Sequence, residues 1–295
     1  SLYSPSLILS TLSFTSLFSL IRATPLENLL DSKKEYVSIF LLVSCFFLLG
    51  LYDDKFKLNP DKKFILSIIF SILSLTLNEN LLIQNFNLSF YDKSIILNKF
   101  SYFFTLFCII ILINALNFYD GINGQSLIFF IIVFGYLSLQ SPLQLFYLIL
   151  IFICVFILFL NLKNKVFLGD SGIYLLGSIL VILLIYEHNI FKTIKFADEI
   201  FLLLILPGVD LLRLTLMRMI NGKSAFYGDR NHIQHLLIKR CSLLFSNFIL
   251  FSVSVIPVIL FSYFKLSFFL VFFIFLVIYI FLIQFLNSND KKHNY

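Results

Sequence analysis

Four short stretches of the sequence combine acidic, amide, basic and histidine side chains in a way that suits chemistry on phosphates. They read LYDDKFKLNPDKKF from residue 51, NALNFYDGING from residue 114, FLGDSG from residue 167 and INGKSAFYGDRNHIQHLL from residue 220. Carboxylates together with amide side chains suit a hard cation, because Mg²⁺ takes a few protein oxygens and shares the rest of its shell with water and substrate phosphates. The basic and histidine side chains of the last stretch suit phosphate oxygens.

Each stretch also has a structural interpretation. Aspartates such as Asp53 and Asp54 commonly end a helix in solvent, and Asp170 would serve as the N-cap of a helix that begins near residue 172. His232 and His235 suit a surface helix, since a zinc site would need a third soft ligand that the sequence does not place nearby. Taken one at a time, these residues do not establish a function.

Asp120 is harder to explain structurally. It ends an apolar run, and Asn117 and Asn114 precede it at a spacing of three, which places all three on one face of a helix. Polar side chains at that depth in a membrane are costly unless they have partners, so they indicate a functional site.

Membrane helices must position these residues. The chain is 60% hydrophobic and 13% charged, with a mean hydropathy of +0.97, which identifies an integral membrane protein. A span needs about 20 apolar residues, or about 17 at the least. We expect a single all-α multi-pass transmembrane domain over 1–295 with about ten spans, near 2–21, 36–52, 63–78, 101–117, 125–140, 143–162, 172–187, 199–216, 246–263 and 266–286.

The distribution of charge predicts the orientation. Alternating sides from the loop at Asp53 puts 14 of the 22 Lys and Arg residues on one side, which the positive-inside rule makes cytoplasmic. These are Lys55, Lys57, Lys62, Lys63, Lys163, Lys165, Arg213, Arg218, Lys223, Arg230, Lys239, Arg240, Lys291 and Lys292. Because these charges lie in short loops between apolar segments, the net charge of +6 indicates membrane orientation and no nucleic-acid partner.

The acidic residues converge on the same side. Asp53, Asp54, Asp120, Asp170, Asp210 and Asp229 come from five segments, yet all fall on or just inside the predicted cytoplasmic face. A cation and phosphate site at a membrane surface suits phosphoryl transfer from a soluble donor to a lipid acceptor. The lysines after the aspartate pair, Lys62 among them, would hold a lipid phosphate at the headgroup level.

The four stretches together resemble the polyprenyl-phosphate N-acetylhexosamine-1-phosphate transferases, and they occur in that family's order over roughly residues 45 to 240. The resemblance implies transfer of a sugar 1-phosphate from a UDP-sugar to a membrane polyprenyl phosphate, with release of UMP. It also implies a Mg²⁺ cofactor, which Mn²⁺ can replace, and a cytoplasmic active site. The histidine stretch is more similar to the branch that makes lipid-linked N-acetylhexosamine for O-antigen, teichoic acid or capsule, which predicts an enzyme of the bacterial inner membrane acting on undecaprenyl phosphate.

The resemblance assigns roles residue by residue. The catalytic residues it implies are Asp53, Asp54, Asp120 and His232. The substrate-binding residues are Asn114, Asn117, Arg230 and His235, to which Lys62 is added for its charge beside the aspartate pair. The metal ligands are Asp170 first and Asp120 next.

Two departures from the family pattern keep alternatives open. Asn123 stands in DGING where the family commonly has an aspartate, and Gln234 stands in HIQH where it commonly has a histidine. A catalytically impaired, lipid-binding member of the family is therefore one alternative, and a secondary transporter with acidic groups along an ion pathway is another. The sugar, the length of the polyprenyl chain and the oligomeric state, a homodimer included, are left open by the sequence.

Overall fold

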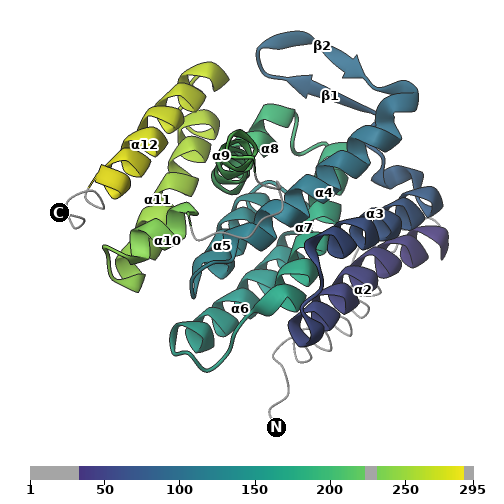
Figure 1. Cartoon of the computed structure of the whole chain (residues 1–295). Coiled ribbons are helices and arrows are strands. Elements are labelled where there is room, and N and C mark those ends of the chain that lie inside the picture. Colours follow the sequence, from purple (N-terminus) through teal and green to yellow (C-terminus); the bar gives the residue numbers. More distant parts are fainter. Residues whose placement is uncertain (1–32, 223–230, 289–295) are drawn as a thin grey trace.

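The structure, a computed structural model, describes residues 33–222 and 231–288 and is mainly helical (Figure 1). Its helices are α2 (Lys33–Phe56), α3 (Pro60–Leu77), α4 (Ser101–Tyr119), α5 (Gln125–Ser138), α6 (Gln144–Leu162), α7 (Gly169–Asn189), α8 (Ala197–Leu203), α9 (Ile205–Ile220), α10 (Ile233–Ile238), α11 (Leu243–Ser262) and α12 (Phe268–Ser288). Two strands, β1 (Asn85–Leu88) and β2 (Tyr91–Ile96), and the short 3₁₀ turns Glu79–Leu81 and Asn98–Phe100 complete the order.

Six of the described helices are long and apolar enough to span a membrane, which makes the chain a multi-pass membrane protein. They are α2, α4, α6, α7, α11 and α12, and the bent pair α8 and α9 would make a seventh. The predicted segments near 63–78 and 125–140 are helical as α3 and α5. However, α3 carries three charges in its first turn, and the 14 residues of α5 extend only about 21 Å. The predicted span near 2–21 lies outside the described residues, so the count of about ten stays a prediction.

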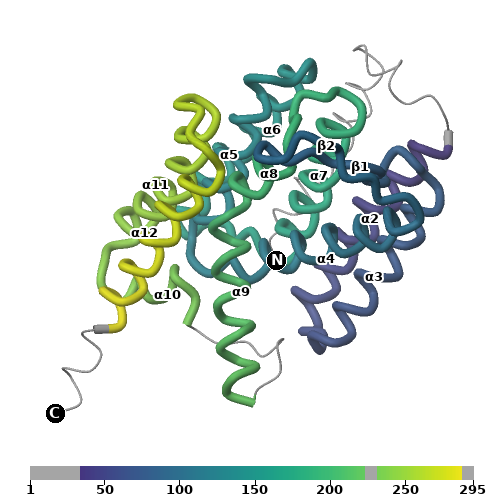
Figure 2. Tube along the Cα trace, turned by 90° about the horizontal axis from the view of Figure 1, so that it is seen from above, coloured from purple at the N-terminus to yellow at the C-terminus, as the bar shows by residue number. Residues whose placement is uncertain are grey.

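Helix α7 lies inside the molecule and packs against both α2 and α4 (Figure 2). In its most apolar stretch 89% of the residues are buried, compared with 22–39% in the other candidate spans. The close approach of α2 depends on Gly50, because a Cβ there would lie 2.6 Å from the carbonyl oxygen of Asp170 and 2.6 Å from the backbone nitrogen of Ser171. This contact brings the C-terminal end of α2 against the first turn of α7.

The predicted span near 199–216 is not one continuous helix. The chain forms α8 and α9 there, which meet at Leu204 with a bend of 76°. Pro207 has no N–H to donate to the carbonyl of Leu203, so a continuous helix would lose a hydrogen bond at this point. Placed in the first turn of a new helix, the same proline loses nothing.

The expectation of an all-α chain is also incomplete, because β1 and β2 form an antiparallel hairpin between α3 and α4. Leu88 pairs with Tyr91 across the turn. The alternating pattern of NFNLSFYDKSII is typical of a strand pair and is the signal for this hairpin in the sequence. The hairpin lies beside α8 at the end of the molecule shown uppermost in Figure 1.

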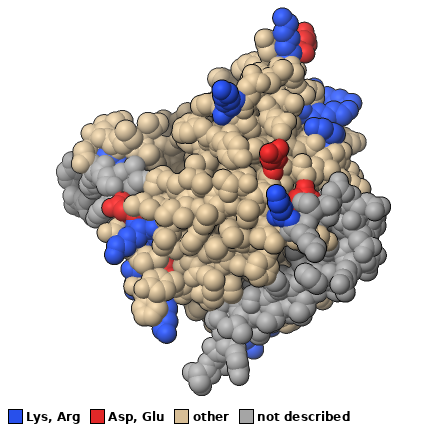
Figure 3. Space-filling view, turned by 90° about the vertical axis from the view of Figure 1, so that its right-hand side faces the viewer, with Lys and Arg blue, Asp and Glu red and all other residues tan. Residues whose placement is uncertain are grey.

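The two ends of the molecule differ in surface composition from the region between them. Figure 3 shows a mainly uncharged surface on which Lys, Arg, Asp and Glu side chains form a few separate groups. Many exposed side chains of α6 and α12 are large and apolar, including Phe152, Phe156, Phe273 and Phe281, as a lipid-facing surface requires. The end that contains residues 53–63, 120–124, 163–171 and 231–240 is named the site end, and the end that contains residues 79–100 and 187–199 is named the hairpin end.

Candidate active site

The aspartate pair at the end of α2 contacts the first turn of α7. Asp54 accepts hydrogen bonds from the backbone N–H groups of Asp170 (2.8 Å) and Ser171 (3.1 Å). These N–H groups have no partner within their own helix, so Asp54 caps α7 from another helix. The left-handed Gly169 (φ 67°) precedes them, and a Cβ at Gly169 would lie 2.8 Å from a carboxylate oxygen of Asp54.

Lys63 joins the buried member of the pair to α7. Its ammonium group forms an ion pair with Asp53 and a second one with Asp170 at 3.0 Å. Asp53 also accepts a hydrogen bond from the backbone N–H of Leu58 (2.7 Å), and its side chain is only 6% exposed. The side chain of Asp170 is 31% exposed, so of these two carboxylates it is the one presented to a ligand.

Lys62, which the sequence analysis assigned to substrate binding, lies elsewhere on α3. It is exposed in the first turn, whereas the next residue, Lys63, continues the buried stripe of Ser67, Ser71 and Ser74. This stripe has the spacing of one helix face, and it is the signal that distinguishes the two lysines in the sequence. Lys63 is therefore a site residue that the sequence analysis missed.

Asp120 follows α4 directly and lines a cavity of about 320 Å³. The other lining residues are Gly121, Ile122, Asn123, Gly124, Ser126, Leu127, Asn161, Phe167, Leu168 and Gly169. Burial is the main cause that raises the pKa of Asp120 to about 6; the hydroxyl of Ser126 acts in the opposite direction, and the negative charge of Asp54 adds to the rise. The carboxyl groups of Asp120 and Asp54 are thus close enough to interact, and Gly169 links the cavity to Asp170.

The asparagines of the second stretch make different contacts. Asn114 donates a hydrogen bond to the carbonyl of Ile110 one turn back in α4 (2.8 Å), and Asn117 lies partly exposed in the last turn before Asp120. Asn123 lines the cavity, and its amide donates to the side chain of Asn164 (2.6 Å). The asparagine at the position of the family's aspartate therefore connects the cavity to the loop after α6.

The loop at the cavity is held from three other helices. Asn161 of α6 accepts a hydrogen bond from the N–H of Gly124 (2.6 Å), and Asn247 of α11 donates to the carbonyl of Asn123 (2.8 Å). Gln234 of α10 donates to the carbonyl of Phe118 (3.0 Å) and is fully buried against Gly121. Gln234 thus has a structural contact in place of the histidine that is common in the family.

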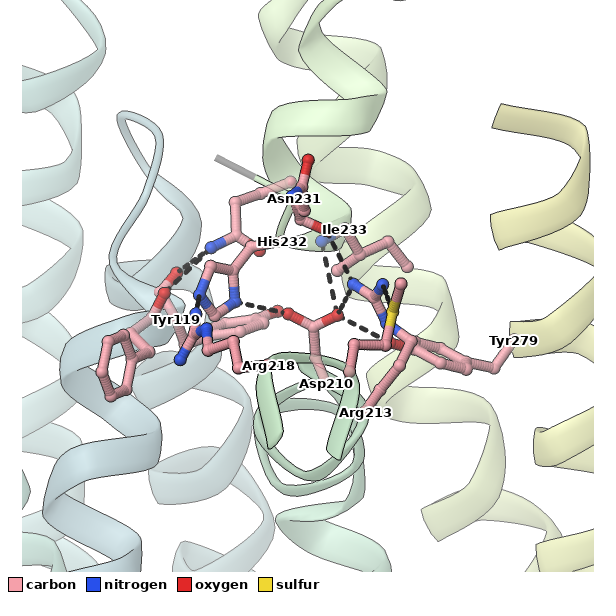
Figure 4. A network of polar contacts seen from close by, with 11 residues as sticks. Tyr119, Asp210, Arg213, Arg218, Asn231, His232, Ile233 and Tyr279 are labelled. Atoms are coloured by element: carbon pink, nitrogen blue, oxygen red, sulfur yellow. Dashed lines mark hydrogen bonds and ion pairs between the residues drawn. The ribbon is translucent and has the colours of Figure 1, made fainter. Parts of the chain in front are cut away.

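The remaining described part of the fourth stretch forms a polar network with α9 and α12 (Figure 4). The ring of His232 donates from Nδ1 to Asp210 (2.7 Å) and stacks on Phe118 at 5.7 Å between centroids. Arg218 also lies over the ring of Phe118, at 5.4 Å. His232 therefore contacts Phe118, which lies two positions before Asp120 in the chain.

Of the other predicted residues in this stretch, His235 lies in α10 with a partly exposed side chain. Arg230 lies outside the described residues. Asp210 and Arg218 fall on the same predicted side of the membrane as the other site residues, but their sequence pattern assigned Asp210 no role. Its signal was an aspartate three residues before Arg213 in an apolar helix, a spacing at which the two side chains pair in a helix.

The site suits a divalent cation held jointly with a substrate. Among residues 33–222 and 231–288, no three acidic, histidine or cysteine side chains converge to form a metal cage. Asp120 nevertheless lines the cavity, and the partly exposed Asp170 directly follows Gly169 of its wall. Mg²⁺ is commonly held by one or two carboxylates plus substrate phosphates and water. The donor set therefore fits Mg²⁺ better than zinc, which needs more protein ligands.

The fold and the site together define a polytopic membrane protein whose acids, from helices far apart in the sequence, meet lysine and arginine at one end. The model of Glycosyl transferase family 4 matches residues 36–188, which is more than half of the chain. The chain belongs to this family, as the resemblance in its sequence predicts. The matched part contains Asp53, Asp54, Asp120 and Asp170.

Curated relatives are similar over most of the chain. An undecaprenyl-phosphate alpha-N-acetylglucosaminyl 1-phosphate transferase of Escherichia coli O157:H7 is 28% identical over 203 residues, 65% of this chain and 55% of the relative. A protein of the same name from Salmonella typhi is 27% identical over 217 residues, 69% of this chain and 59% of the relative. A probable undecaprenyl-phosphate N-acetylglucosaminyl 1-phosphate transferase of Bacillus subtilis is 26% identical over 211 residues, 68% and 57% respectively. The chain thus spans little more than half the length of these relatives.

Proposed function

We propose that the protein transfers N-acetylhexosamine 1-phosphate from a UDP-sugar to undecaprenyl phosphate and releases UMP, giving a lipid-linked sugar for cell-envelope polysaccharide. The observation that carries this proposal is that Asp120 lines a cavity whose wall ends at Gly169, directly before Asp170, and that Asp54 and Lys63 both contact Asp170. The names of the curated relatives, which describe transfer of N-acetylglucosaminyl 1-phosphate to undecaprenyl phosphate, support the same reaction.

The donor is assigned to the cavity at Asp120. A volume of about 320 Å³ is in the range of small-molecule sites, which are largely preformed and place a few polar groups among apolar ones. The ring of Phe167, 65% exposed at the cavity, offers a face on which a base can stack. Arg218, His232, His235 and Arg230 are the proposed contacts to the donor's phosphates, and Asn114 and Asn117 are proposed to contact the nucleotide sugar.

The acceptor is assigned to the exposed lysines at the end of α2 and the start of α3. Lys55, Lys57 and Lys62 are exposed around the start of α3, and each would contribute about 1 kcal/mol to the attraction of an anionic headgroup. A phosphate monoester is largely ionised near neutral pH because its second pKa is about 6. Asp53 and Asp54 are therefore assigned mainly to orienting the lipid phosphate and the start of α7, because that phosphate has little need of a base to remove its proton.

The reaction is an in-line displacement. An oxygen of the lipid phosphate attacks the phosphorus that bears the sugar, and the bond from that phosphorus to the bridging oxygen of UMP breaks. The protein's contribution is to position both phosphates and to stabilise the charge that develops on the leaving group. Lys63 supports this by holding Asp170 in place and by adding a positive charge beside it.

Asp170 and Asp120 are the residues that would hold Mg²⁺. The ion would supply charge neutralisation at the pyrophosphate of the donor. Mn²⁺ can take the same ligands, because it shares the preference for carboxylate oxygens.

The orientation proposed from the charge distribution places the site end in the cytoplasm of a bacterial cell, at the inner membrane, where soluble UDP-sugars are found. Residues 1–295 are proposed to form one transmembrane transferase domain, with a homodimer as one arrangement of the chains.

The test is a transfer assay with purified protein, radiolabelled UDP-sugars and undecaprenyl phosphate. A panel of UDP-N-acetylhexosamines with Mg²⁺ should give a lipid-soluble labelled product and one UMP per product from at least one sugar, and EDTA should abolish it. Protein that binds undecaprenyl phosphate but yields no product from any sugar of the panel would support the impaired, lipid-binding alternative.

The secondary transporter is tested in the same preparation. In proteoliposomes a transporter would move labelled solute across the bilayer without forming a lipid-linked product. The proposed function requires the reverse result, in which the label moves to the lipid and the interior of the vesicle gains none.

A further inference from the structure

Asp210 is a buried charge outside the carboxylate cluster of the candidate active site. It is 2% exposed, lies on α9, and does not line the cavity at Asp120. A buried carboxylate is costly unless cations and hydrogen bonds compensate it. Its partners therefore indicate what the residue does.

One oxygen of Asp210 is held by two helices. Oδ1 accepts hydrogen bonds from the hydroxyl of Tyr279 on α12 (2.6 Å) and from the guanidinium of Arg213 (2.8 Å). Arg213 also donates to the hydroxyl of Tyr279 (2.8 Å) and to the carbonyl of Asn231 (2.7 Å). These contacts fix the plane of the carboxylate, and they leave Oδ2 facing His232 (Figure 4).

The contact with Asp210 determines how the ring of His232 is presented. A carboxylate only accepts hydrogen bonds, so Nδ1 carries a proton. Nε2 lies 3.4 Å from Nη2 of Arg218, and a guanidinium only donates, so Nε2 presents its lone pair there. Both groups lie over Phe118, which holds them at the end of α4 just before Asp120.

We propose that Asp210 is a positioning residue for the transfer reaction, which fixes the ring plane and tautomer of His232 and, through that ring, the place of Arg218. Arg213 and Tyr279 hold Asp210 in turn. Asp210 does not touch the substrate in this scheme, and its whole effect on the reaction passes through His232. The inference rests on the proposed function, because His232 and Arg218 are assigned there to the donor's phosphates.

A double-mutant cycle tests this dependence. Asp210→Asn keeps the shape of the side chain, but its amide N–H₂ would face groups that also donate. The change should lower kcat/KM by about 10- to 100-fold, as expected for the loss of a charged hydrogen bond. In a His232→Ala background the same change should cost less than about threefold, because residues that act as a unit are not additive. The KM for the lipid acceptor should stay within about twofold throughout. Equal losses in both backgrounds would overturn the proposal.

Asp198→Asn is the matched control, because Asp198 is equally buried (2% exposed) at the hairpin end, where it accepts hydrogen bonds from Ser89. Transfer by the Asp198→Asn protein should stay within about twofold of wild type once folded protein is counted. A loss of transfer equal to that of Asp210→Asn would mean that burial of any charge, and not the contact with His232, carries the effect.

A chemical measurement separates this proposal from the proposed function. Diethyl pyrocarbonate modifies accessible imidazoles, and peptide mass spectrometry gives the modification rate of His232 relative to His235. The ratio should rise at least about threefold in Asp210→Asn, since the 4% exposed ring is released, and should not change in Asp198→Asn. An unchanged ratio in Asp210→Asn would show that Asp210 does not hold the ring of His232, and would overturn the proposal. If wild-type protein forms no lipid-linked product, the proposed function fails, while the ratio still decides whether Asp210 holds the ring.

Discussion

The acidic residues at the two ends of the molecule have different partners. At the hairpin end, Glu187 is 1% exposed and accepts hydrogen bonds from the hydroxyls of Tyr147 (2.7 Å), Ser141 and Thr193. At the site end, Asp170 is 31% exposed and is paired with the cation of Lys63. The first carboxylate is closed in by neutral donors, whereas the second is charge-compensated and open to a ligand.

This comparison distinguishes acids with structural contacts from those that we propose to act in transfer. Glu187 joins α7 to α6 and to the loop after α7, and Asp198 joins α8 to the turn of the hairpin. Buried acids also lie away from the site end, where serine, threonine and tyrosine hydroxyls satisfy them. We therefore do not take burial alone as a sign of a role in transfer, and each buried acid is assigned by its partners.

The largest expected effect is on Asp170. Asp170→Asn removes the carboxylate assigned to the metal and should lower transfer by about 10²–10³-fold or more, the range for losing one group that stabilises the transition state. Glu187→Gln, the matched change at the hairpin end, should keep transfer within about threefold. The two variants are compared in the radiolabelled transfer assay at saturating Mg²⁺. Similar losses in both would remove the distinction between the ends.

The contact between α2 and α7 is tested at Gly50. Gly50→Ala places a Cβ against the backbone of Asp170 and Ser171, which cannot rotate away, so it should destabilise the protein by about 1–3 kcal/mol and lower transfer at least tenfold. Thermal unfolding and transfer are measured on the same preparation. Gly135→Ala in α5 is the control, because a Cβ there meets no atom within 4 Å, and it should be neutral or stabilising by up to about 1 kcal/mol. A Gly50→Ala protein with wild-type transfer would mean that the ends of α2 and α7 need not meet.

The two neighbouring lysines sharpen the comparison within the site end. Lys63→Gln breaks both ion pairs with Asp53 and Asp170 and should lower transfer by about 10- to 100-fold. Lys62→Gln removes only an exposed charge and should raise the KM for undecaprenyl phosphate by about fivefold, equivalent to about 1 kcal/mol. Steady-state kinetics at varied lipid concentration distinguish the two. The reverse order of effects would restore the sequence-based assignment of Lys62 over Lys63.

The smallest expected effect is at Tyr147. Tyr147→Phe removes one of the three hydroxyl donors to Glu187 and should lower the free energy of unfolding by about 1–2 kcal/mol with transfer unchanged. Chemical or thermal denaturation in detergent measures the loss. A fall in transfer without a loss of stability would indicate that the hairpin end takes part in the reaction.

Much of the helical arrangement could be predicted from the sequence. Hydropathy alone predicts long apolar runs such as α6 and α12 as membrane spans, because a span must satisfy its backbone hydrogen bonds internally and face lipid with apolar side chains. The bend at Leu204 was missed because hydropathy records composition and not the missing N–H of Pro207. The hairpin was missed because its alternating pattern is short and lies in a polar connection.

For the candidate site, the sequence predicted which acids gather but not what they contact. The spacing of Asn117 and Asp120 and the predicted sides were enough to place Asp54, Asp120 and Asp170 at one end. The cap that Asp54 forms on α7, and the bridge from Lys63, depend on a helix contact made by residues more than a hundred positions apart. Such pairings follow from packing at Gly50, which no local pattern reports.

The most direct test of the central claim is a titration of Mn²⁺ binding, followed by electron paramagnetic resonance in the presence of UMP. If the acids of the site end hold a divalent ion together with a nucleotide phosphate, wild type and Glu187→Gln should each bind one Mn²⁺ per chain, and Asp170→Asn should lose at least about tenfold in affinity. Equal Mn²⁺ affinity in wild type and Asp170→Asn would contradict the account.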